Sequence, residues 1–220
     1  PSFQRPGARS YTSIAMWTPV QLHDLQASPE SAVFTREGFH RDYPEIRLWA
    51  QYQFFAHVPY FLFESKMEIV QPVEIYWLRN QEMTMDDLFT HVAWPTRDGT
   101  PRVATFEERK PLLEKDPLPL DTPWVAFYHQ QRGYGYGAVV LHYTATTTAK
   151  AKTSINDGAG NGKYWDRYLI GQVNTALKPG DRYTERTAYV LFRTRPGAPV
   201  GEFLEWEKRL RNPLRAELLP

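Results

Sequence analysis

Apolar and polar residues alternate along a large part of the chain, most clearly between residues 45 and 54. Every second residue of this segment is apolar. A period of two is typical of a β-strand, because successive side chains point to opposite faces of a sheet. The pattern therefore predicts a strand with one buried face, which carries Ile46, Leu48, Ala50, Tyr52 and Phe54.

Other segments of strand length follow, and turn-forming Pro, Gly, Asn and Asp residues separate them. These predicted strands cover residues 60–69, 73–78, 124–129, 137–144, 164–173 and 186–193. A first strand or ordered arm is expected at residues 14–17, and a hairpin connection at residues 35–38.

Three segments depart from this alternation. Residues 106–122 are charged and rich in proline, which predicts an irregular excursion on the surface. Residues 144–162 are polar, small and rich in glycine, so we expect a long exposed loop that is mobile when nothing is bound. Residues 203–210 intersperse large apolar residues with charges, which predicts a short C-terminal helix.

Together these elements predict an all-β fold, an antiparallel β-sandwich with a short C-terminal helix. About eight to ten short strands with regular turn punctuation favour this class. The chain is expected to form one sandwich domain over residues 1–220. It begins at Pro1 without an initiator Met, so we expect a processed product or a piece of a longer protein. Part of an active site would then lie outside it.

Composition and charge exclude several classes of function. The 26 Lys and Arg residues nearly balance the 25 Asp and Glu residues, which argues against a nucleic-acid partner bound through its phosphates. No apolar run approaches the roughly 18 residues of a membrane span. The absence of Cys excludes thiol nucleophiles and Cys-ligated metals. Neither a dinucleotide fingerprint nor a P-loop is present, so no cofactor is predicted.

The most unusual local sequence runs from His129 to Gly137, where three glycines alternate with two tyrosines. In a continuous strand Tyr134 and Tyr136 share a face with His142, and the glycines leave the other face bare. We predict a cleft lined by Tyr134, Tyr136 and His142, with His129 and Arg132 at its edge. The two tyrosines and the two histidines are the catalytic candidates, and Arg132 would hold an anionic group. The alternative is a twisted strand whose glycines accommodate large rings.

Other candidate binding residues lie in or next to predicted strands. Glu64 is a carboxylate within an apolar segment, which suits either a general acid with a raised pKa or a solvent-facing residue. Trp165 could stack on a sugar ring, while Arg167 and Arg79 could bind a carboxylate. The six histidines show no metal-ligand spacing, so no metal site is predicted.

A resemblance adds to this interpretation. Residues 60–65, 74–80 and 91–94 resemble the strand progression of galactose-mutarotase-like β-sandwiches, a fold of sugar mutarotases and of modules in polysaccharide lyases and glycoside hydrolases. The resemblance implies a ligand on the concave face of one sheet, served by His, Glu, Arg and Tyr. The chain is shorter than a complete member of that fold.

Two functional hypotheses follow. The first is a carbohydrate-active protein, secreted or periplasmic, that binds or processes a glycan on an aromatic sheet face containing Arg and His. As an enzyme it would be a polysaccharide lyase, a glycoside hydrolase or a sugar epimerase. The alternative is a non-catalytic accessory or structural subunit, whose aromatic face contacts another chain or domain.

Overall fold

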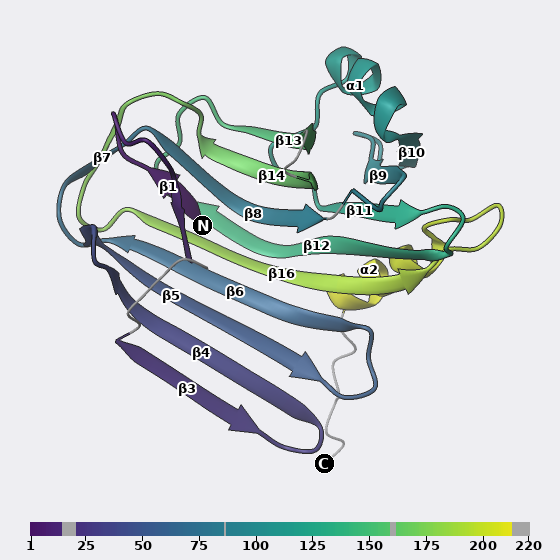
Figure 1. Cartoon of the computed structure of the whole chain (residues 1–220), viewed down its shortest axis with the longest axis horizontal. Coiled ribbons are helices and arrows are strands. Elements are labelled where there is room, and N and C mark those ends of the chain that lie inside the picture. The colour runs from purple at the N-terminus through teal and green to yellow at the C-terminus, as the bar shows by residue number, and fades with distance from the viewer. Residues whose placement is uncertain (15–20, 86, 159–161, 213–220) are drawn as a thin grey trace.

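The computed structural model describes residues 1–14, 21–85, 87–158 and 162–212. Strands make up 57% and helices 11% of it, which confirms the predicted all-β class. Every pairing between neighbouring strands is antiparallel. Figure 1 shows the arrangement of the sheets.

The larger sheet has nine strands in the order β10-β9-β11-β12-β16-β6-β5-β4-β3. In chain order these are β3 (Leu22–Ala27), β4 (Ser31–His40), β5 (Tyr43–Phe55), β6 (Tyr60–Ile69), β9 (His91–Pro95), β10 (Pro101–Thr105), β11 (Trp124–His129), β12 (Tyr134–Ala145) and β16 (Arg182–Arg193).

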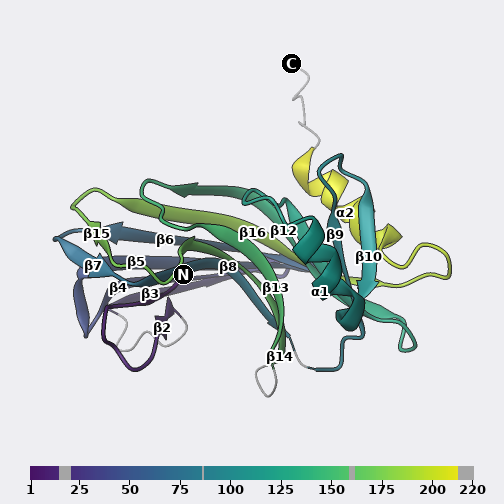
Figure 2. The same ribbon diagram turned by 90° about the horizontal axis from the view of Figure 1, so that it is seen from above.

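The smaller sheet has five strands in the order β13-β14-β8-β1-β2, and a further sheet pairs β15 with β7. The strands of the five-stranded sheet are β1 (Ser2–Gln4), β2 (Thr12–Ser13), β8 (Trp77–Met85), β13 (Lys152–Gly158) and β14 (Gly162–Ile170). The two-stranded sheet consists of β7 (Val73–Ile75) and β15 (Thr175–Leu177). The β13–β14 hairpin bends away from the nine-stranded sheet (Figure 2).

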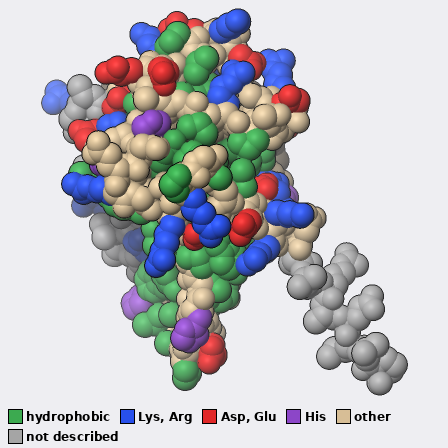
Figure 3. Space-filling model, turned by 90° about the vertical axis from the view of Figure 1, so that its right-hand side faces the viewer, with side chains coloured by type: hydrophobic (Ala, Val, Ile, Leu, Met, Phe, Trp, Pro, Cys, Tyr) green, Lys and Arg blue, Asp and Glu red, His purple; other side chains and the backbone are tan. Residues whose placement is uncertain are grey.

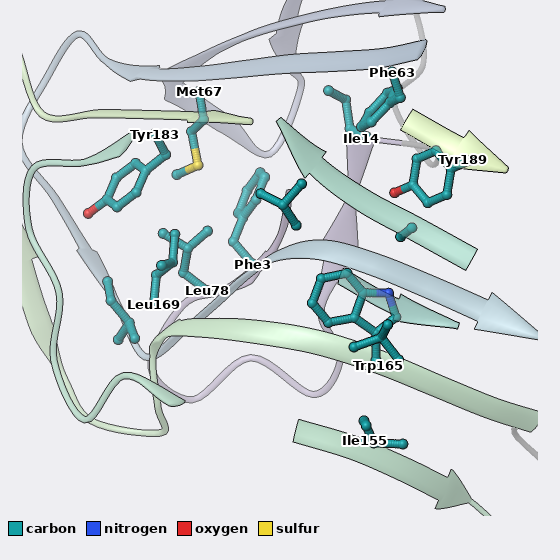
Figure 4. Packing of buried hydrophobic residues seen from close by; sticks show 14 of the residues in the cluster. Phe3, Ile14, Phe63, Met67, Leu78, Ile155, Trp165, Leu169, Tyr183 and Tyr189 are labelled. Carbon is teal, nitrogen blue, oxygen red and sulfur yellow. The ribbon is translucent and has the colours of Figure 1, made fainter. Parts of the chain in front are cut away.

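The main core lies between the two large sheets, as Figure 4 shows. Phe3, Leu78 and Trp165 point into it from the five-stranded sheet, and Met67 and Tyr183 point into it from the nine-stranded sheet. Burying each such side chain contributes about 1.5–3 kcal/mol. We call the side of the nine-stranded sheet that faces this core its inner face.

A second apolar layer lies on the outer face of the nine-stranded sheet, under α2 (Gly201–Arg211), which confirms the predicted C-terminal helix. Phe203 of this helix packs on Trp124 and Phe192. A Cβ atom at Gly137 would stand 2.3 Å from the ring of Phe203, and one at Gly135 would stand 2.1 Å from that of Phe192. The glycines therefore make room for large rings, which was the alternative to a bare face open to a ligand.

The prediction of an irregular excursion at residues 106–122 was wrong in its first half, because α1 spans Phe106–Lys115. Thr105 caps this helix. Its hydroxyl accepts from the backbone N–H of Glu108, whose carboxylate accepts from the backbone N–H of Thr105. This capping box, visible in the sequence as Thr-x-x-Glu, outweighs the one hydrogen bond that Pro111 removes inside the helix.

Two loop predictions also need correction. Residues 144–162 are not one long loop, because β13 pairs with β14 from Lys152 to Gly158; residues 159–161 lie outside the described part of the chain. The hairpin connection expected at residues 35–38 is wrong as well, since β4 runs through them and pairs with β5. Residues 15–17 of the predicted first strand also lie outside the described residues.

Candidate functional site

Aromatic side chains form a continuous ladder across four neighbouring strands on the inner face of the nine-stranded sheet. Tyr136 of β12 stacks on Tyr189 of β16, with ring centroids 5.9 Å apart and 13° between the planes. Tyr189 stacks on Phe61 of β6 at 5.1 Å, and Phe61 contacts Phe54 of β5 at 5.1 Å. The register explains the ladder, because Phe61 lies directly opposite both Tyr189 and Phe54.

A second row of rings runs beside the first. Tyr52 of β5 lies 4.8 Å from the ring of Phe63 and 6.4 Å from that of Phe34, while Leu25 of β3 pairs with Phe34. We use the name aromatic face for these two rows without Phe63 but with Leu191, which pairs with Tyr136. It consists of Leu25, Phe34, Tyr52, Phe54, Phe61, Tyr136, Tyr189 and Leu191.

Much of the aromatic face is in contact with water. Leu25 is 65% exposed, Leu191 59% and Phe54 47%, whereas Tyr189 at its centre is only 7% exposed. Strands β3 to β6 extend past the edge of the five-stranded sheet (Figure 1). The part of their inner face that carries Leu25 and Phe54 is therefore open, whereas Leu48 and Met67 on the same face are buried in the core. Soluble proteins rarely expose a contiguous apolar surface, and where they do it usually binds a ligand or a partner.

Polar groups border the aromatic face on one side. Arg36 of β4 lies one row away from Tyr52, opposite Ala50, and the same row continues through Ser65 to Glu185. Ser65 Oγ donates to Glu185 Oε1 at 2.8 Å, and both side chains are buried. Burial raises the pKa of Tyr52, and the charge of Arg36 partly offsets this. A guanidinium and a carboxylate therefore stand beside the rings.

Two tyrosines of this face, Tyr52 and Tyr136, have a raised pKa and are protonated at neutral pH. Burial raises the pKa of Tyr136 well above its ordinary value, the opposite of what a tyrosine acting as a base requires. Its hydroxyl is therefore a hydrogen-bond donor at neutral pH. A tyrosine that acts as a base needs a neighbouring cation to lower its pKa, and burial shifts the pKa of Tyr136 the other way.

Three of the predicted site residues meet at the turn between β11 and β12. The backbone N–H of Arg132 donates to Nδ1 of His129 at 3.2 Å, and the rings of His129 and Tyr134 lie 6.2 Å apart. Tyr134 also contacts Phe89 edge-on at 6.0 Å. Figure 3 looks at this end of the molecule, where side chains of both charges are interspersed with hydrophobic ones. The roles assigned to these three residues stay predictions.

His142 does not share a face with Tyr134 and Tyr136, so that part of the prediction is wrong. The pairing of β12 with β16 shifts between Val140 and His142, which makes Leu141 an extra residue in the strand. Such a β-bulge reverses the alternation beyond it. His142 is therefore exposed on the outer face, whereas the neighbouring Tyr143 packs towards the core.

Glu64 lies on the same outer face as His142. Both pair with Arg186 of β16, which stands between them in the sheet. Glu64 is only partly exposed, and its Oε1 lies 3.1 Å from Nζ of Lys66. Glu64 and His142, which the sequence analysis did not relate to each other, are thus close in the sheet, because Arg186 lies between them. They lie on the face opposite to Tyr134 and Tyr136.

Trp165 and Arg167 cannot contact a ligand as predicted, because both are 0% exposed within the sandwich. Irregularities in the pairing of β14 with β8 bury three consecutive residues, so simple alternation fails there. The guanidinium of Arg167 donates to the carbonyl oxygen of Thr122 at 2.9 Å and lies 3.9 Å from the ring centre of Tyr143. Burial lowers its pKa to about 10.

Arg79 is also buried, on the far side of the five-stranded sheet from the core. Its Nη1 lies 2.7 Å from Oδ2 of Asp166, and its guanidinium lies 4.1 Å from the ring centre of Trp77. Ser154 Oγ donates to the other oxygen of Asp166 at 2.7 Å. Arg79 is thus engaged in a buried ion pair, and a ligand carboxylate would have to compete with Asp166 for it.

The sequence analysis did not identify the aromatic face as a site. Its rings were assigned to predicted strands, where the alternation of Tyr52 and Phe54 indicated a buried face like that of Ile46 and Leu48. The number of aromatic residues was the available signal, but it does not say which rings remain uncovered. Over the described residues, no group of three or more His, Asp or Glu side chains is placed to hold a metal ion.

No protein-family model matches the sequence, and no curated protein is detectably similar to it. The described part of the chain contains no helix long and apolar enough to cross a membrane.

Several solved structures have a similar fold at low sequence identity. An α-N-acetylgalactosaminidase, NagBb from Bifidobacterium bifidum, is 12% identical with a TM-score of 0.53, over 96% of this chain and 33% of that one. The α-galactosidase AgaA from Geobacillus stearothermophilus is 10% identical with a TM-score of 0.47, over 79% of this chain and 26% of its own.

YeaD from Salmonella typhimurium, a protein named as a mutarotase, is 8% identical with a TM-score of 0.43, over 79% of this chain and 64% of that chain. The chain thus spans 26% of the length of AgaA and 33% of that of NagBb. At these identities the likeness concerns the fold alone. The proteins of similar fold, which include YeaD and a protein named as an aldose 1-epimerase, are carbohydrate-related by their names. The similarity to NagBb, with its TM-score of 0.53, concerns the fold, and the predicted antiparallel β-sandwich is confirmed as a fold class.

Proposed function

We propose that this chain binds a carbohydrate on the aromatic face. The observation that carries the proposal is the ladder of Tyr136, Tyr189, Phe61 and Phe54, which ends in a ring that is 47% exposed. A pyranose ring presents C–H groups on its faces and hydroxyl groups around its edge. Such a molecule suits a flat surface of rings that has polar groups at its border.

The polar groups at the border supply complementary partners for sugar hydroxyls. Protonated Tyr136 can donate a hydrogen bond, and the raised pKa of its hydroxyl keeps that donor available at neutral pH. Arg36 adds further donors beside Tyr52. The proposal concerns binding, because the tyrosine pKa shifts favour hydrogen-bond donation over proton abstraction.

A protein partner is the second candidate occupant of the aromatic face. The observation that favours it is the high exposure of two aliphatic side chains, Leu25 and Leu191, which offer no stacking surface to a sugar. Charge-poor patches with aromatic and aliphatic residues are typical of the centres of protein interfaces. A partner protein would need both leucines, whereas a sugar would need the rings.

The test is a titration of the purified protein with neutral and acidic oligosaccharides, followed by calorimetry and by NMR shifts. Phe54→Ala should weaken binding about fivefold, the loss expected when an aromatic contact worth about 1 kcal/mol is removed. The matched control is Trp49→Ala, an aromatic substitution on the opposite face of the same strand, which should leave affinity unchanged.

Two outcomes would contradict the proposal. One is the absence of any saccharide binding at millimolar concentration by a folded protein. The other is equal weakening by Phe54→Ala and Trp49→Ala, because the inner face would then have no special role. Loss of a protein complex in Leu25→Lys or Leu191→Lys, without any saccharide binding, would instead favour the second candidate.

A further inference from the structure

A cleft separates helix α1 from strand β13, at a different place in the fold from the aromatic face. Its volume is about 450 Å³, within the range of sites for small molecules. Arg109, Lys110 and Leu113 line it from α1, Ser154 and Asn156 from β13, and Tyr164 from β14. Figures 1 and 2 both show α1 beside the β13–β14 hairpin.

Arg109 is the unusual residue of this cleft. It is only 8% exposed, and its Nε and Nη1 atoms are buried with no hydrogen-bond partner. Its guanidinium lies 5.3 Å from the ring centre of Phe106, a contact that satisfies none of its N–H groups. Buried cations are normally paired or hydrogen-bonded, so an unpartnered one in a cleft calls for a ligand.

The neighbouring charges leave Arg109 available. The carboxylate of Asp157 on β13 acts on Arg109 electrostatically. The same carboxylate also forms an ion pair with Lys163, whose Nζ lies 3.9 Å from Oδ1 of Asp157. On α1, Glu114 stands one helical turn after Lys110, so their charges offset each other along the rim. Burial lowers the pKa of Arg109, and the group stays charged at neutral pH.

The β13 side of the cleft offers ordered polar groups. Asn156 Nδ2 donates to Ser154 Oγ at 3.0 Å, and Ser154 Oγ donates to Asp166 at 2.7 Å. This chain of hydrogen bonds fixes the side chain of Asn156 at the wall of the cleft. Leu113 and Tyr164 contribute apolar surface beside these groups. The cleft therefore combines one unpaired cation with polar and apolar walls.

We propose that this cleft binds a small organic anion, whose carboxylate accepts hydrogen bonds from Arg109 while its body lies against Leu113 and Tyr164. A sugar acid of one or two rings fits both the chemistry and the volume.

The experiment is a calorimetric titration of the full chain at constant ionic strength with four probes: glucuronate, glucose, inorganic phosphate and inorganic sulfate. Glucuronate should bind, and glucose should bind at least about tenfold more weakly, since one charge-assisted hydrogen bond is worth that much. If phosphate or sulfate binds as tightly as glucuronate, the site recognises the free anion and the organic part of the proposal is overturned.

The variant that tests the contact is Arg109→Met, with Lys115→Met at the end of the same helix as its control. Arg109→Met should weaken glucuronate binding at least about tenfold, while Lys115→Met should not change it. Arg109→Met should also keep or raise the melting temperature, because it replaces an unpartnered buried cation by an apolar side chain of similar length.

A folded Arg109→Met protein that binds glucuronate with unchanged affinity would overturn the proposal. If Arg109→Met fails to fold, Asn156→Leu tests the same cleft from the opposite wall and should weaken glucuronate binding alone. Phe54→Ala distinguishes the two sites, since it should lower affinity only for ligands of the aromatic face. Glucuronate binding lost in Phe54→Ala and retained in Arg109→Met would assign the anion to that face and overturn the cleft proposal.

Discussion

The two faces of strands β5, β6 and β16 expose different kinds of side chain to water beyond the edges of the core. On the outer face, charged side chains pair across the strands: Arg47 with Glu37 at 3.1 Å, and Arg182 with Glu68 at 2.9 Å. Even the aromatic Trp49 is covered there, since Nζ of Lys66 lies 4.1 Å from its ring centre.

The inner face of the same strands carries rings and leucines where the five-stranded sheet no longer covers it. Phe54 and Leu191 are about half exposed there. The charged side chains of the outer face are explained by solubility alone, without any ligand. The inner face exposes apolar surface at a free-energy cost, which becomes understandable once a ligand or partner covers it.

The largest expected effect is the removal of the ring at the centre of the ladder. Tyr189→Ala should lower the free energy of unfolding by about 3–5 kcal/mol, because it leaves a cavity between Phe61 and Tyr136. Urea denaturation measures the change. Glu68→Ala on the outer face of β6 is the control, and an equal loss there would remove the distinction between the faces.

A smaller loss is expected when the close approach of α2 to the sheet is blocked. Gly137→Ala should cost about 1–3 kcal/mol, because the new Cβ overlaps the ring of Phe203. Denaturation measurements should show that Phe203→Leu in the same chain recovers part of this loss. If Gly137→Ala is as stable as the unchanged protein, the glycine has another role.

Alkaline pH should destabilise the fold through the buried tyrosines, two of which lie on the inner face. Burial raises the folded-state pKa of Tyr136 and Tyr52 above the ordinary value near 10. Their contribution is fully present below the unfolded pKa and is lost as pH rises through the folded pKa. The free energy of unfolding should therefore fall above about pH 10.

Tyr136→Phe should make that alkaline decline shallower, as measured by denaturation at a series of pH values. Tyr134→Phe is the control, since Tyr134 lies at the exposed end of the strand. An unchanged slope in Tyr136→Phe would show that this hydroxyl is not what titrates.

The smallest effect is expected on the outer face. Glu68→Gln should lower the free energy of unfolding by no more than about 1 kcal/mol, because its ion pair with Arg182 is exposed to solvent. The difference between the two proteins should shrink in molar salt, which screens the pair. A loss that persists at high salt would indicate a role beyond the charge.

The class of fold was predictable from sequence, because alternation is a local property of the chain. The strand around Ile46 and Leu48 and the helix around Phe203 both follow from the spacing of large apolar residues. The candidate site was harder to predict from the sequence than the fold. Tyr134, His129 and Arg132 are close in sequence and meet in space, whereas Trp165 and Arg167 have the right chemistry and point into the core.

The sequence by itself determined the period of each strand, the absence of thiol chemistry and the near balance of charge. Only the tertiary structure decided where the five-stranded sheet ends, and so which rings of one alternating segment stay exposed: Ala50 is buried and Phe54 is not. It also decided the side on which His142 lies, because the single extra residue at Leu141 reverses the alternation. Both depend on contacts between segments far apart in the chain, which local spacing does not encode.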